Sequence, residues 1–127
     1  MAIMAKFETK IRGNFQEIIT ALDAYIMNSA ASIQMIDETQ YLLSDTQIIA
    51  RVYDKYFMWN SSRASLSLTA VAQDDVIYIS AIGAGGGQGA IFNFSWGAEE
   101  DFVAVVEDGL AHNAFLWEAF ETWVSTN

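Results

Sequence analysis

The residues that most invite a chemical interpretation are the five glycines within the run Gly83–Gly89, which lies between two apolar runs of alternating pattern. Glycine loses the most backbone entropy on ordering, so such a run is favoured where the chain needs positive φ or a close backbone approach. The run is therefore either a mobile or bulged connection or a cradle of backbone amides. A P-loop needs Lys and Ser or Thr after its last glycine, whereas Ala90-Ile91 follows here. The sequence favours a connection over a phosphate site.

The single histidine, His112, and the acidic groups are weak candidates for catalysis. A zinc site needs three or four ligands, mainly His or Cys, and the chain has one histidine and no cysteine. The acidic runs have structural causes, because Asp74-Asp75 fits a turn and Glu99-Glu100-Asp101 fits the first turn of a helix. We therefore expect no metal, no cofactor and no enzymatic activity. Catalysis by a pair of carboxylates is the alternative that we rank last.

Basic residues on two strand-like runs form another candidate site. If those strands lie near each other, the helix-free face of the sheet would carry a basic and aromatic patch that recognises an anionic ligand or an acidic partner. The alternative is a solvated sheet face whose cations pair across strands with Glu8. The expected members of this patch are Lys6, Lys10, Arg51, Tyr53 and Lys55.

Composition and charge limit the class of protein. A chain of 127 residues with 53% apolar content forms one domain, residues 1–127, with a genuine core. The absence of cysteine fits a reducing compartment, and no apolar stretch reaches the ~20 residues that span a bilayer. We expect a soluble cytoplasmic protein without a membrane partner. The formal charge is −10 and no Lys or Arg follows Arg63, which argues against a nucleic-acid partner.

The hydrophobic periods predict the elements that must position these residues. Alternation over residues 4–12 predicts a strand, and Asn14 with Glu17 predicts the N-cap of a helix over 15–28. Five further strands are expected at 32–40, 47–59, 64–72, 76–82 and 90–96, followed by a helix from Ala98 that breaks or kinks near Gly109 or His112. Short turns require antiparallel neighbours. The expected fold is an α+β two-layer sandwich, with a meander of about six strands, in the order β-α-β-β-β-β-β-α, and both helices on one face.

Aromatic residues near the C-terminus suggest two functions. The last stretch is apolar over more than one helical face, so either it lies deep in the core or its second face meets another chain. We favour the second, a homodimer through Phe115, Phe120 and Trp123. This favours a noncatalytic protein-interaction module, whose partner is a protein or a second copy. The alternative is a carrier of a small apolar ligand between the sheet and the C-terminal helix. The candidate lining residues, which could equally be plain core, are Phe92, Phe94, Trp96 and Trp117.

Several short segments resemble a family of small uncharacterised bacterial proteins. They are Met4-Ala5-Lys6-Phe7, Arg51-Val52-Tyr53, Ser65-Leu66-Ser67-Leu68, Ile79-Ser80-Ala81-Ile82, the glycine run, and Trp96-Gly97 with Glu100 and Phe102. The resemblance covers residues 4–112, and the tail from Asn113 is longer than the family pattern. It implies no activity and no functional residue, because that family has none assigned. The element order is also similar to helix-grip proteins, some of which hold apolar ligands beneath a long C-terminal helix.

Overall fold

The alternating and helical hydrophobic periods are realised as six strands and two helices. The computed structural model describes residues 3–57, 62–87, 98–112 and 121–126. In chain order the elements are β1 (Ile3–Arg12), α1 (Phe15–Asn28), β2 (Ile33–Leu43), β3 (Thr46–Phe57), β4 (Ser62–Gln73), β5 (Val76–Gly87), α2 (Ala98–His112) and β6 (Glu121–Thr126).

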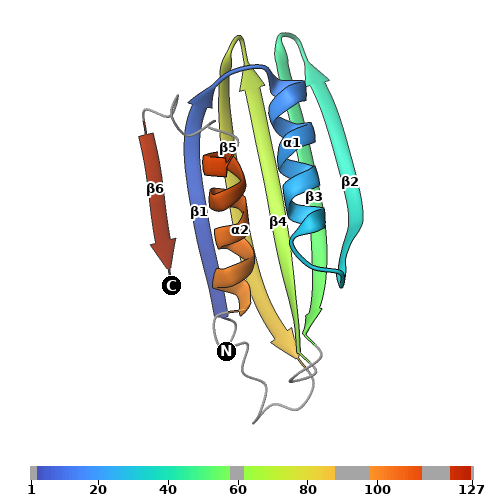
Figure 1. The fold of residues 1–127 in the computed structure, drawn as a ribbon. Coiled ribbons are helices and arrows are strands. Elements are labelled where there is room, and N and C mark those ends of the chain that lie inside the picture. Colours follow the sequence, from blue (N-terminus) through green and yellow to red (C-terminus); the bar gives the residue numbers. More distant parts are fainter. Residues whose placement is uncertain (1–2, 58–61, 88–97, 113–120, 127) are drawn as a thin grey trace.

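The strands form one antiparallel sheet in the order β2-β3-β4-β5-β1-β6, in which β1 to β5 are the long strands and β6 pairs at the edge. Both helices cover the same face of this sheet (Figure 1). The predicted α+β fold, with an antiparallel sheet and two helices on one face, is confirmed.

The first strand and helix follow directly from their residues. In β1, alternate residues from Ala5 to Ile11 are buried, because successive side chains of a strand point to opposite faces. The side chain of Asn14 caps α1, accepting a hydrogen bond from the backbone N–H of Glu17 at 2.9 Å. One stripe of α1 is buried in the core, comprising Phe15, Ile18, Ile19, Leu22 and Ile26.

Tight turns connect the meander. The β2–β3 and β4–β5 hairpins each have two turn residues, Ser44-Asp45 and Asp74-Asp75. The first residue of each turn has positive φ, 56° at Ser44 and 58° at Asp74. Two-residue hairpin turns need this conformation there so that the turn matches the right-handed twist of the strands. The turn expected at Asp74-Asp75 is confirmed, whereas most of the one expected at residues 60–62 lies outside the described residues.

Helix α2 packs on small inward-facing residues of the sheet and against α1. Helix α2 contacts β1, β4 and β5, where the buried inward residues include the small Ala5, Ala64, Ala81 and Gly83. The helices also contact each other at Gly109, where an added Cβ would lie 3.0 Å from both Leu22 Cδ1 and Tyr25 Cδ1. Gly109 is therefore a point of close helix packing rather than the expected break, and α2 continues to His112.

The glycine run does not begin as a loop. Residues Gly83–Gly87 continue β5, paired with Ser62–Leu66 of β4, and Gly83–Gly85 also pair with β1. The interpretation as a mobile or bulged connection is wrong for these five residues, because β4 pairs with all of them and β1 pairs with the first three. Residues 88 and 89 lie outside the described residues.

The C-terminal segment also differs from expectation. Residues Glu121–Thr126 form β6, antiparallel to β1, where we expected the continuation of a helix. Aromatic and β-branched residues such as Trp123 and Val124 satisfy a strand as well as a helix, and the unpaired edge of β1 offers hydrogen bonds to a strand. The sixth strand thus comes from the C-terminus, while the strand expected at 90–96 lies outside the described residues. Neither α1 nor α2 is long and apolar enough to cross a membrane.

Candidate functional site

The sheet face opposite the helices, here called the open face, carries a large exposed apolar surface. Its side chains belong to the strand positions that alternate with the buried ones. Six large residues on this face are between 37% and 61% exposed: Tyr41, Leu43, Val52, Tyr56, Tyr78 and Ile82. Ile48, Val71 and Val76 on the same face are partly exposed. Scattered apolar residues are normal on a protein surface, but several large ones gathered on one face indicate a candidate interaction site. The rung Thr39, Ala50, Thr69, Ser80 and Glu8 runs between them and is mostly polar.

The strand register arranges the open face in rungs that run across the sheet. One rung, the aromatic rung, runs from β2 to β1 and contains Tyr41, Ile48, Val71, Tyr78 and Lys10. The Lys10 ammonium lies over the Tyr78 ring, 5.5 Å from its centroid. The aromatic rung therefore crosses the five long strands and carries a cation on β1, beyond which the backbone of Glu121 in β6 pairs with Lys10.

A second rung has opposite charges at its two ends. This charged rung contains Asp37, Val52, Ser67, Ile82 and Lys6, again from β2 to β1. Asp37 follows a bulge in β2, where the register with β3 shifts between Met35 and Asp37. Lys6 pairs with Glu8 of its own strand at 3.3 Å, and both side chains stay about 40% exposed.

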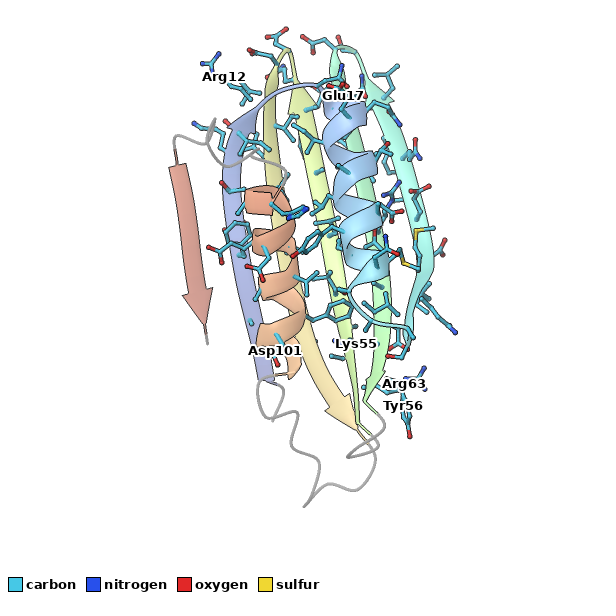
Figure 2. The ribbon with its side chains drawn as sticks, viewed as in Figure 1. Arg12, Glu17, Lys55, Tyr56, Arg63 and Asp101 are labelled. Carbon is cyan, nitrogen blue, oxygen red and sulfur yellow. The ribbon has the colours of Figure 1, made fainter. Side chains whose placement is uncertain are left out.

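The basic and aromatic patch expected from sequence does not form as one patch. Lys6 and Lys10 lie on the open face of β1, whereas Arg51, Tyr53 and Lys55 lie on the helix-covered face of β3. Strands β1 and β3 are also separated by β4 and β5. Figure 2 shows Lys55 beside α2, close to the end that carries Asp101 and far from Arg12. Its ammonium lies over the Phe102 ring of α2 at 5.9 Å.

The helix-covered part of that patch is a charged cluster joining α1, β2 and β3. Arg51 pairs with Glu38 through Nε, and its Nη1 lies 3.5 Å from Asp23 Oδ1. The fully buried Tyr53 donates a hydrogen bond to the same Asp23 oxygen at 2.7 Å. These four residues are called the Arg51 cluster below.

The electrostatics of the Arg51 cluster favour a structural role over acid–base chemistry. Burial, together with the hydrogen bond to Asp23, raises the pKa of Tyr53 well above its usual value, so the phenol stays neutral. The hydrogen bond from Arg51 lowers the pKa of Glu38, so this carboxylate stays ionised. Groups held away from neutral pH are poor general acids and bases. The cluster fastens α1 to the edge of the sheet.

A groove of about 340 Å³ lies between the start of α1 and the β2–β3 hairpin. Apolar side chains of Phe15, Leu42 and Ile49 and the amide Gln47 contribute to its wall, and Leu42 is 70% exposed. The groove lies on the helix side of the sheet, opposite the open face. It is large enough for a small ligand.

Most of the ligand-binding and self-association residues expected from sequence are not placed. Phe92, Phe94, Trp96, Phe115, Trp117 and Phe120 lie outside the described residues. The backbone at Trp123 pairs with Glu8 of β1 in β6. His112 ends α2 with its ring 5.3 Å from that of Tyr25. Within the described ranges, no three His, Asp or Glu side chains come together as metal ligands.

Comparison with protein families gives one match. The family model described as "Family of unknown function (DUF6054)" matches residues 4–113. The chain belongs to this family. The resemblance inferred from the sequence, over residues 4–112, is thereby confirmed. A search of curated proteins gave no match.

The DUF6054 match covers β1 to α2 and ends before β6. Every open-face residue named above therefore lies within the matched residues, and β6 lies outside them. The family description assigns no activity, so it adds no evidence of catalysis.

Sequence reasoning placed a candidate site on the helix-free face of the sheet but missed the apolar residues of the open face. A signal was present in β5, where Tyr78 and Ile82 alternate with buried residues such as Ile79. Strands β2 and β3 are apolar on both faces in places, so alternation alone did not say which face the helices cover. Tyr53 was placed on the wrong face for this reason.

Proposed function

We propose that this DUF6054 protein is a noncatalytic interaction module that acts as a homodimer through the open face. The observation that carries the proposal is the exposure of six large apolar or aromatic side chains on one face of the sheet. Water contact with such a surface is unfavourable by about 25 cal/mol per Å² of apolar area. A protein surface that covers it removes this cost.

The size of the open face supports the same proposal. Five strands spaced about 4.8 Å apart, each about ten residues long at about 3.3 Å per residue, cover about 800 Å². A stable interface of standard size buries about 800 Å² on each partner. Symmetric dimers are the commonest oligomers, so a second copy is the partner that we favour.

Light scattering or sedimentation at micromolar concentration tests this proposal. The protein should have the mass of a dimer, and the double variant Val52→Lys/Tyr78→Lys should have the mass of a monomer. Both residues are exposed, so the variant should keep the circular dichroism spectrum of the folded protein. The matched control is Leu42→Lys, exposed on the opposite side of the sheet, which should remain dimeric. A monomeric wild-type protein would contradict the homodimer.

A carrier of a small apolar ligand is the second candidate function. The groove beside Phe15 and Leu42 favours it, because its volume of about 340 Å³ is in the range of small-ligand sites. This groove is distinct from the position beneath the C-terminal helix expected from sequence. Native mass spectrometry of the purified protein separates the two functions, since a carrier should show added ligand mass that Leu42→Lys removes. An unliganded dimer favours the interaction module.

A further inference from the structure

The charges at the two ends of the open face indicate how a second copy would dock. This inference rests on the homodimer proposed above and specifies its geometry. We infer that two open faces pack against each other about a two-fold axis parallel to β4, so that β2 of each copy faces β1 of the other.

The strand order makes this arrangement self-complementary. Among the five long strands β4 is central, with β3 and β5 beside it and β2 and β1 outermost. A two-fold axis along β4 places each rung opposite the same rung of the second copy, with the β2 end of one against the β1 end of the other. In the charged rung, Asp37 then faces Lys6 of the second copy, Val52 faces Ile82, and Ser67 faces its own equivalent. Each ion pair occurs twice in the dimer.

Surface relief agrees with the same pairing. A shallow depression of about 240 Å³ is lined by Asp37, Thr39, Ala50 and Val52 on β2 and β3. The residue that faces this region from the second copy is Ile82 of β5, which is 37% exposed. An exposed aliphatic side chain would therefore meet a hollow of the opposite chain, and such shape complementarity is typical of protein interfaces.

The perpendicular axis is less favourable. A two-fold axis across the strands at the height of Glu8, the middle of the sheet, would place β1 against β1, with Glu8 facing its own equivalent and Lys6 facing Lys10 of the second copy. Like charges facing each other in an interface weaken binding and exclude wrong orientations. The axis parallel to β4 replaces that repulsion with attraction between Lys6 and Asp37.

Charge exchange between the two ends of the rung tests this geometry. Lys6→Asp alone and Asp37→Lys alone should each weaken dimerisation about tenfold or more, because each creates two like-charge contacts. An equimolar mixture of the two variants should form a heterodimer, and the double variant Lys6→Asp/Asp37→Lys should recover self-association. Analytical ultracentrifugation and native mass spectrometry report both results.

The outcomes separate this geometry from the proposed function. A wild-type monomer would contradict the homodimer itself. A wild-type dimer that Val52→Lys/Tyr78→Lys dissociates, but whose charge variants do not recombine, would contradict only the axis. Tighter association of Lys6→Asp than of wild type would indicate the perpendicular axis and overturn the inference.

A crosslinking measurement tests the contact between open faces without changing charge. The chain has no cysteine, so a single introduced thiol reports one position. Ser67→Cys on β4 should crosslink to its own equivalent through a bismaleimide that spans the ~10 Å between packed sheets. Asn28→Cys at the end of α1, on the helix side, should not. Equal crosslinking at both positions would contradict the arrangement.

Discussion

At the scale of single residues, the Arg51 cluster shows how a polar group is kept inside this fold. Tyr53 is fully buried, and its hydroxyl is tolerated because Asp23 accepts its hydrogen bond. Arg51 of β3 forms ion pairs with that same carboxylate on α1 and with Glu38 on β2. The cluster therefore specifies how α1 sits over β3, which apolar contacts alone would leave less defined.

The lowered pKa of Glu38 predicts a pH dependence of stability. A carboxylate whose pKa is lower in the folded state than its unfolded value of 4.5 stabilises the fold above that value. This contribution is lost as the pH falls below about 4.5 through the folded pKa. We expect Glu38→Gln to be less stable than wild type at pH 7 and to lose less stability on acidification. Urea unfolding between pH 7 and pH 3 measures both slopes.

A control and a contrary result are available for this prediction. Glu107→Gln, on the exposed side of α2, should follow the wild-type dependence. Parallel curves for wild type and Glu38→Gln would show that Arg51 does not stabilise the Glu38 carboxylate in solution.

At the scale of elements, two glycines occupy tightly packed positions: Gly13 connects β1 to α1, and Gly109 lies where α2 contacts α1. Gly13 connects β1 to α1 with φ of 154°, and an added Cβ would lie 2.7 Å from Ile18 Cδ1. Gly109 lies in a regular helix, and its close neighbours are the flexible side chains of Leu22 and Tyr25. The same substitution should therefore have different effects at the two positions.

We expect Gly13→Ala to lower the free energy of unfolding by about 1–3 kcal/mol, because backbone strain and a buried clash combine. Gly109→Ala should change it by less than about 1 kcal/mol, since the gain in helix propensity offsets the tight contact. Denaturant unfolding of the two variants gives the comparison. Equal losses would mean that conformational strain at Gly13 is unimportant.

The elements differ in how well their sequences specify them. Strand β1, helix α1 and the alternating β4 were predicted correctly because one face of each is clearly apolar. Segment 121–126 was not, because Trp123 and Val124 are compatible with the hydrophobic period of a helix or of a strand. The segment forms a strand because the edge of β1 is available for pairing. The expected patch failed because residues 51–55 have apolar or aromatic neighbours on both faces, so the sequence alone did not fix their orientation.

At the scale of the whole molecule, the helix layer covers one side of the sheet and leaves the other as a broad surface (Figure 1). Stability and association are then linked, because a dimer that unfolds to separate chains becomes more stable as its concentration rises. We expect the melting temperature of the wild type to rise over a tenfold increase in protein concentration.

Differential scanning fluorimetry or calorimetry at two concentrations measures this effect. The variant Val52→Lys/Tyr78→Lys should melt at a temperature that does not depend on concentration. A concentration-independent wild type would argue that the open face meets another kind of partner or none.

The small size of the residues beneath α2 has a consequence for redesign. Alanine and glycine under α2 leave no spare volume, so a library that enlarges Ala64 or Ala81 would wedge this helix away from the sheet. Next to α1, β3 presents the larger branched side chain of Ile49, which can be exchanged for others of similar volume. A cavity for a bound chromophore is therefore better engineered beside α1, with the small residues beneath α2 left unchanged.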